Sequence, residues 1–175
     1  MTKTFIEILH SWQIFYATLA TACATLVGLL FVALSLNVDV LRREENDGFM
    51  FLARLTFGEF LGVLMVSLVF LIPHQVPFSI VIALLTLGIA WTTSVFLTYK
   101  RRIKAYGYQR NPWYIRRGFV FSLFGSLGII GVGFAILFGK MNALYWLVLM
   151  LAAQLTSACL TAWFLLVQVR DKALK

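Results

Sequence analysis

Residues 49–72 read FMFLARLTFGEFLGVLMVSLVFLI, a continuous apolar stretch broken only by one arginine and one glutamate. A bilayer core about 30 Å thick is crossed by about 20 apolar residues of helix. Inside lipid every backbone N–H and C=O group needs a partner within the protein, and a single segment satisfies them only as a helix. The stretch therefore predicts a transmembrane helix over residues 49–72.

Four other stretches share this length and apolar character: residues 13–37, 78–99, 118–138 and 143–169. The whole chain has 175 residues, of which 61% are hydrophobic and 13% are charged. A soluble domain has about a quarter of its residues charged. We therefore expect an all-α membrane protein, a single transmembrane helical domain over residues 1–175 with five transmembrane helices. A long basic loop is expected over residues 100–117.

The positions of lysine and arginine predict the orientation of these helices. With the 100–117 loop in the cytoplasm, 13 of the 15 basic residues fall on that side, and only Lys3 and Lys140 fall on the other. Cytoplasmic loops of membrane proteins carry such an excess. The N-terminus is then periplasmic and the C-terminus cytoplasmic.

The basic residues near the cytoplasmic ends of the spans are expected to contact anionic lipid heads. They are Arg54, Lys100, Arg101, Arg102, Lys104, Arg116 and Arg117. This placement explains the formal net charge of +8. Lipid, and no nucleic acid, is therefore the expected partner of the basic surface.

Glu59 is the most informative polar residue, because it falls near the middle of the predicted helix over residues 49–72. Ionisable residues inside a membrane are costly and usually functional. One interpretation is a carboxylate that handles protons or cations. The other is a neutral glutamic acid that is hydrogen-bonded to a neighbouring helix, for example to Gln154. Asn37 and Asp39 end the first predicted span, either as a mouth for ions or as an ordinary helix terminus.

Small residues at three- or four-residue spacing allow membrane helices to pack closely. The candidates for such packing are Ala20, Ala24, Gly28, Gly58, Gly62, Gly125, Gly128 and Gly131. One of these faces could instead line a wet pathway. Because one five-helix chain has little need of so many close-packing faces, we also expect a homo-oligomer.

Metal binding and catalysis have little support in the sequence. His10 and His74 are predicted at the outer interface, with Glu7 one turn before His10, but isolated interfacial histidines are the commoner outcome. Cys23 and Cys159 lie inside apolar segments, where cysteine behaves as a small hydrophobic residue. No P-loop, GxSxG or HExxH motif occurs. We expect no cofactor, no metal and no enzyme activity.

The run ATLVGLLFVALSLN, residues 24–37, follows Trp12 and Phe15, and a Leu-Ile-Pro stop ends at Pro73. These features resemble a group of small bacterial multi-pass inner-membrane proteins, some of which are labelled as modulators of a membrane-bound AAA protease. The resemblance covers about the first 75 residues. It implies a location in the bacterial inner membrane and supplies no catalytic residues.

Two functions follow as expectations. The first is a homo-oligomeric ion channel or passive pore with Glu59 near the path. The alternative is a non-catalytic regulatory or scaffold partner of another membrane complex, for example a membrane protease. A pore should have a polar stripe that is continuous through the membrane, whereas a partner should have an exposed face of small or aromatic residues.

Overall fold

The computed structural model describes residues 5–38, 47–73, 76–106, 113–140 and 142–173. The described part contains helices and no strands. The helices are α1 (Phe5–Leu36), α3 (Asp47–Leu71), α4 (Pro77–Tyr106), α5 (Trp113–Leu137) and α6 (Ala143–Ala173). Each of these five helices contains a segment that is long and apolar enough to cross a membrane. The structure is therefore compatible with an integral membrane protein of five spans, as the sequence predicts.

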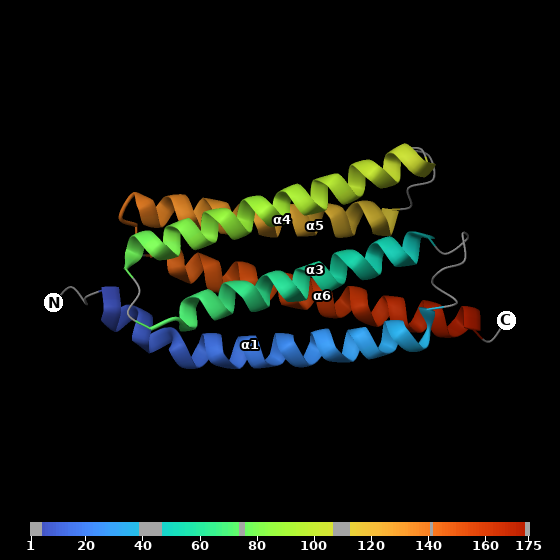
Figure 1. Cartoon of the computed structure of the whole chain (residues 1–175), viewed down its shortest axis with the longest axis horizontal. Helices are drawn as coiled ribbons and strands as arrows, with labels where there is room; N and C mark the ends of the chain where they lie inside the picture. Colours follow the sequence, from blue (N-terminus) through green and yellow to red (C-terminus); the bar gives the residue numbers. More distant parts are fainter. Residues whose placement is uncertain (1–4, 39–46, 74–75, 107–112, 141, 174–175) are drawn as a thin grey trace.

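Helix α3 lies at the centre of the bundle and packs against each of the other four helices. Helices α4 and α5 run side by side along one edge, and α1 forms the opposite edge (Figure 1). The two ends of the chain lie at opposite ends of the bundle (Figure 1). A span of membrane between those ends would place the termini on different sides.

One hydrophobic core joins all five helices at the end of the bundle that contains the α5–α6 turn. Its members include one or more buried residues from each helix: Tyr16, Phe70, Ile80, Ile129 and Leu147. The rings of Tyr16 and Phe70 stack with centroids 4.3 Å apart, which fixes α1 against α3. Large apolar side chains remain exposed along the outside of the helices, as the lipid-facing surface of a membrane protein requires.

Two short turns end and begin helices where the sequence predicts breaks. Gly139 has a φ of 76°, a left-handed conformation that glycine adopts without steric penalty. The N–H groups of Gly139 and Lys140 donate to the carbonyl oxygens of Ile136 and Ala135, both at 2.9 Å. These bonds cap the end of α5 and allow an immediate reversal into α6. Helix α4 starts at Pro77, whose fixed φ suits a first helical position.

The prediction of a loop over residues 100–117 is wrong for most of that segment. Helix α4 continues through Lys104 to Tyr106, and α5 already begins at Trp113. Lysine and arginine are good helix formers, so the change from apolar to basic residues ends the apolar span without ending the helix. In the sequence, the end of α4 directly precedes Gly107 and the start of α5 directly follows Pro112, two residue types that disfavour the interior of a helix.

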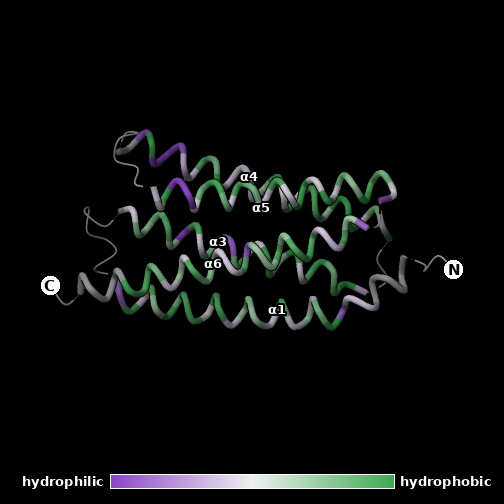
Figure 2. Tube along the Cα trace, turned by 180° about the vertical axis from the view of Figure 1, so that it is seen from behind, coloured by the Kyte–Doolittle hydropathy of each residue, from purple (hydrophilic) through white to green (hydrophobic). Residues whose placement is uncertain are grey.

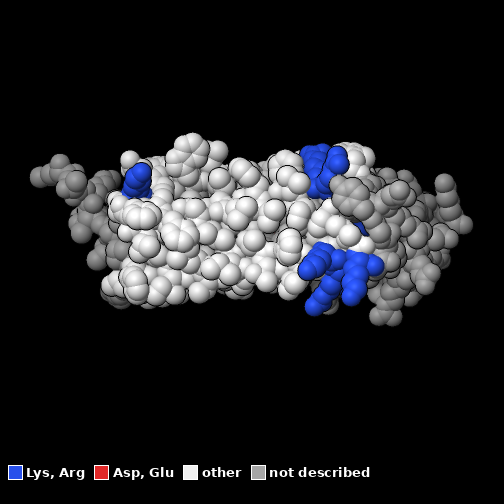
Figure 3. Space-filling model, turned by 90° about the horizontal axis from the view of Figure 1, so that it is seen from above, with Lys and Arg blue, Asp and Glu red and all other residues white. Residues whose placement is uncertain are grey.

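Charge is confined to the ends of the bundle on the face that Figure 3 shows, with an uncharged band between them. Figure 2 likewise shows hydrophobic residues along most of each helix and hydrophilic residues where α4 ends and α5 begins. Such a band between two polar ends has the form expected of a membrane-embedded surface.

Candidate functional site

Glu59 lies at the centre of its helix and inside the bundle. The apolar span of α3 runs from Gly48 to Leu71, so Glu59 has eleven span residues before it and twelve after it. Its side chain is only 2% exposed. Helix α3 is the central helix, and its rotation directs Glu59 toward α5 and α6 rather than toward lipid.

Gln154 from α6 and Ser122 from α5 lie beside Glu59. Gln154 is 6% exposed, and it lines the same cavity as Glu59. Ser122 is fully buried and close enough to interact with the Glu59 carboxyl group. The structure therefore brings together the Glu59 and Gln154 that the sequence singled out, and it adds Ser122. We refer to Glu59, Ser122 and Gln154 as the polar cluster.

The polar cluster retains unused hydrogen-bonding capacity. Neither the Ser122 hydroxyl oxygen nor Gln154 Nε2 has a hydrogen-bond partner of good geometry in the described part of the structure. Buried polar groups are normally paired, so these two atoms have room for a further hydrogen bond, as does the buried hydroxyl group of Tyr16 in the hydrophobic core. The cluster contains a carboxyl group, a carboxamide and a hydroxyl group near the middle of the span.

Gly125 positions Gln154. A Cβ atom at residue 125 would overlap with the Gln154 carboxamide, so the amide lies directly on the backbone of α5. Ser122 precedes Gly125 by three residues, which places both on one face of α5. This spacing was the sequence feature that could have identified Ser122 as the third member of the polar cluster.

Two adjacent cavities lie between α5 and α6. The first, of about 280 Å³, is lined by Glu59 and Gln154 on its inner side and by mostly apolar side chains elsewhere. Phe124 and Trp146 form part of its rim and are 66% and 65% exposed. The second, of about 290 Å³, lies toward the start of α5 and contains Arg117. Phe121 and Ser157 line both cavities, so the two lie next to each other, and they are together called here the α5–α6 groove.

Polar side chains also join α4 and α5, away from the α5–α6 groove. The Thr92 hydroxyl donates to the Ser126 hydroxyl oxygen at 2.9 Å, and the Ser126 hydroxyl donates to the Leu123 carbonyl oxygen at 3.0 Å. Both hydroxyl groups are therefore satisfied within the protein. This contact holds two helices together and leaves no free group for chemistry.

Asn37 does not join the polar cluster. Its side-chain Nδ2 donates to the Ala33 carbonyl oxygen at 2.9 Å, and its backbone N–H donates to the Leu34 carbonyl oxygen. These bonds are those of an ordinary helix terminus. Asp39 lies outside the described residues, so the proposed mouth for ions has no structural description.

The small residues fall into two groups. Ala20 is buried, and the positions of Gly62, Gly125 and Gly128 are closely covered by Trp91, Gln154 and Met150. In contrast, Ala24 is exposed, and nothing lies within 4 Å of the Cβ position at Gly28, Gly58 and Gly131. The positions of the second group make no close contact with another helix of the same chain, so the prediction that they pack helices refers to a second chain.

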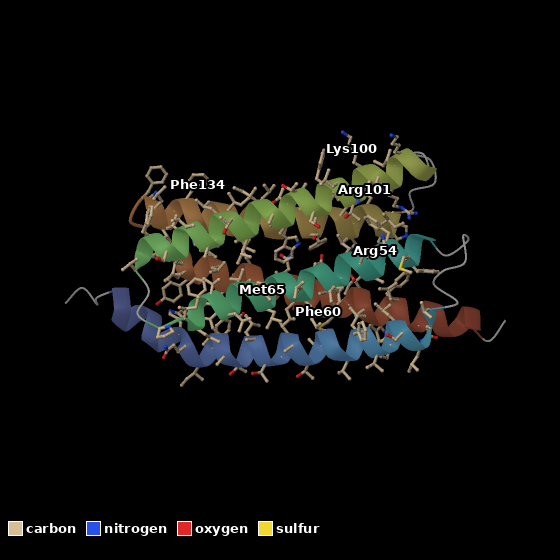
Figure 4. All side chains as sticks on the ribbon, in the orientation of Figure 1. Arg54, Phe60, Met65, Lys100, Arg101 and Phe134 are labelled. Atoms are coloured by element: carbon tan, nitrogen blue, oxygen red, sulfur yellow. The ribbon has the colours of Figure 1, made fainter. Side chains whose placement is uncertain are left out.

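The basic residues that were assigned to lipid heads lie toward one end of the bundle. Figure 4 places Lys100 and Arg101 on α4 and Arg54 on α3, all toward that end. The exposed residues of the set are Arg54, Lys100, Arg101, Lys104, Arg116 and Arg117. Arg102 is half-buried, and its guanidinium lies 5.4 Å from the centre of the Phe51 ring.

The metal candidates gain no support from geometry. No group of three or more His, Cys, Asp or Glu side chains within the described residues is arranged to hold a metal ion. His74 and the His10 side chain lie outside what the structure describes.

A comparison of this chain with protein-family models, curated proteins and solved structures finds no significant match. The functional argument therefore depends on the geometry of the helices and of the polar cluster alone.

Proposed function

We propose that this protein acts by associating with other membrane helices, as a non-catalytic regulatory or scaffold partner of a membrane complex in the bacterial inner membrane. The observation that carries the proposal is the outward face of α1. Thr18, Thr21, Thr25 and Gly28 recur at three- or four-residue spacing on that face and are all exposed. Ala24 is exposed beside them.

This α1 face is suited to close helix contact. The hydroxyl groups of Thr18, Thr21 and Thr25 each donate to a carbonyl oxygen of α1 four residues earlier, at 2.9 Å. The face therefore presents small side chains without unpaired donors. No atom lies within 4 Å of the Cβ position of Gly28, so another backbone can approach there. Small residues at this spacing are what membrane helix interfaces require.

The orientation that accompanies this proposal has a periplasmic N-terminus and a cytoplasmic C-terminus. Seven basic residues of α3, α4 and α5 lie toward one end of the bundle, whereas Lys140 lies in the turn between α5 and α6, at the other end. The positive-inside rule assigns the richer end to the cytoplasm.

Site-specific cross-linking in membranes tests the proposal. In a chain whose two native cysteines are replaced by alanine, Thr21→Cys should form a defined adduct, with a second copy or with another membrane protein. Thr86→Cys is the matched control, because Thr86 is also exposed and its hydroxyl donates to a carbonyl oxygen of its own helix, α4. Equal cross-linking at both positions, or none at Thr21→Cys, would contradict a role for the α1 face.

A homo-oligomeric channel or passive pore is the second candidate, and the polar cluster favours it. Glu59 and Gln154 both line the α5–α6 groove near the middle of the span. The rest of that groove is mostly apolar, so a conducting path would have to form between copies of the chain. Ion flux from liposomes that is lost in Glu59→Gln would support this candidate. An oligomer that is correctly inserted and shows no flux would eliminate it.

A further inference from the structure

We propose that the α5–α6 groove is a binding site for one anionic phospholipid. Its phosphate group lies at Arg117, at the basic end of the bundle. One of its acyl chains follows the groove toward the middle of the membrane and ends over the polar cluster. This site is distinct from the association face on α1.

The groove is at least as long as one leaflet. Its lining on α5 runs from Trp113, in the cavity with Arg117, to Gly125 beside Gln154. Twelve residues of helix rise about 18 Å. Half of a typical hydrocarbon core is about 15 Å. The groove therefore begins near the lipid heads and reaches the midplane, as an acyl chain does, and its lining on α6 continues beyond the midplane to Trp146.

The outer part of the groove suits a phosphate group. Arg117 lines it and is exposed, and its guanidinium lies 5.6 Å from the centre of the Phe121 ring. This cation–π contact places the charge of Arg117 at the groove, and a guanidinium group can still donate hydrogen bonds to a phosphate in the plane of the group. Thr161 and the exposed Trp113 stand at the same opening. Among the described residues, the only acidic side chain that lines either cavity is Glu59, at the far end.

The inner part of the groove suits hydrocarbon. Phe121, Phe124, Leu149 and Met150 line it, and its wall is almost entirely apolar even though Glu59 and Gln154 lie behind it. The Gln154 amide nitrogen is buried, so it is not offered to the groove. The polarity therefore falls from Arg117 toward the midplane, as it does along a phospholipid.

An acyl chain in this groove would also separate the polar cluster from water. Glu59 and Gln154 line a cavity whose rim residues Phe124 and Trp146 are exposed. Water that entered beside them would hydrate the carboxyl group, whereas hydrocarbon keeps the surroundings of that group dry. Occupancy of the groove thus determines the solvation of the one described acidic side chain in the middle of the span.

Lipid binding to the purified full-length protein in detergent tests the inference. Native mass spectrometry with phosphatidylglycerol should show one tightly retained lipid per chain. Arg117→Gln should weaken its affinity about fivefold, the effect of one basic residue near a lipid surface. Arg101→Gln is the control, since Arg101 is exposed at the same end of the bundle but lines neither cavity. Phosphatidylcholine should bind more weakly than phosphatidylglycerol, and soluble glycerol phosphate should not displace the lipid.

A second pair of variants tests the acyl chain. Ala153→Phe should fill the inner groove and reduce retention of phosphatidylglycerol, whereas Ala152→Phe should not, because Ala153 lines the groove and Ala152 does not. Both positions are exposed, so a larger side chain is compatible with folding. Equal losses in Arg117→Gln and Arg101→Gln would overturn the phosphate site. Equal retention in Ala153→Phe and Ala152→Phe would overturn the path of the chain.

Discussion

The position of Gln154 at the centre of the bundle depends on the absence of a side chain at Gly125. The carboxamide of Gln154 occupies the space that a Cβ atom at residue 125 would need. Gln154 is thereby held beside Glu59 and Ser122, and its amide nitrogen is kept out of the lipid. The glycine thus contributes to the polar cluster without supplying any polar side chain.

Gly125→Ala should lower the free energy of unfolding by about 1–3 kcal/mol, because the new methyl group displaces the Gln154 carboxamide from a well-packed position. Gly131→Ala is the matched control on the same helix, since its Cβ position has no neighbour within 4 Å. We expect the control to be neutral or stabilising by up to about 1 kcal/mol. Thermal unfolding of the two variants in detergent measures the difference. Equal stability of both would show that Gln154 moves aside freely.

The sequence identified Glu59 and Gln154, but it could not show which glycines pack against a neighbouring helix. An ionisable residue within an apolar run is visible in a single sequence, because lipid tolerates it poorly. Whether a glycine faces a neighbour depends on how its helix is rotated. In a membrane both the inward and the outward faces of a helix are apolar, so periodicity does not reveal that rotation. Gly125 and Gly131 therefore cannot be told apart in the sequence, although in the structure only Gly125 packs closely against a side chain of another helix.

At the scale of the helices, the lengths of the apolar segments predicted all five spans. They did not predict the residues at which α4 ends and α5 begins. The predicted boundary at residue 99 marks where hydrophobicity ends, whereas α4 ends at Tyr106. Hydrogen bonding along a helix does not depend on the polarity of its side chains, so a helix can leave the bilayer and continue. The basic residues Lys100 to Lys104 are consequently fixed on a helix, where their spacing is set by its geometry.

The end of α5 provides a test of helix termination. Gly139→Ala should lower the free energy of unfolding by about 1–2 kcal/mol, the penalty for a left-handed residue that carries a Cβ atom. The change leaves the apolar spans intact, so the helix content in circular dichroism should stay the same while the unfolding temperature falls. An unaltered unfolding temperature would show that the turn between α5 and α6 adopts another conformation at little cost.

At the scale of the whole molecule, the position of α3 was not predictable from the sequence. Helices that are adjacent in sequence often pack together, and α1 with α3 and α4 with α5 do so. The contact of α3 with α6 joins segments that are far apart in the chain. It depends on side-chain fit at the polar cluster and in the shared core, which a single sequence does not display.

The five spans and the opposite ends of the chain predict a topology that can be measured. A cysteine at position 2 in an otherwise cysteine-free chain should react with a membrane-impermeant maleimide from the periplasmic side. A cysteine at position 174 should react only after the membrane is opened, because the proposed orientation places the basic end of the bundle in the cytoplasm. Reaction of both positions from the same side would rule out an odd number of spans.

The central position of α3 also has a consequence for how the chain is made. Glu59 is synthesised 63 residues before Ser122 and 95 residues before Gln154. At about 5–20 residues per second, Gln154 follows roughly 5–20 seconds after Glu59. During biogenesis α3, which has an acidic residue in its middle, therefore lacks its packing partner α6 until the last helix has been synthesised. During that interval the insertion machinery or lipid must cover the face of α3 that later packs against α6. A nascent chain that stalls before α6 would leave this face uncovered, and we expect quality-control proteases to degrade it.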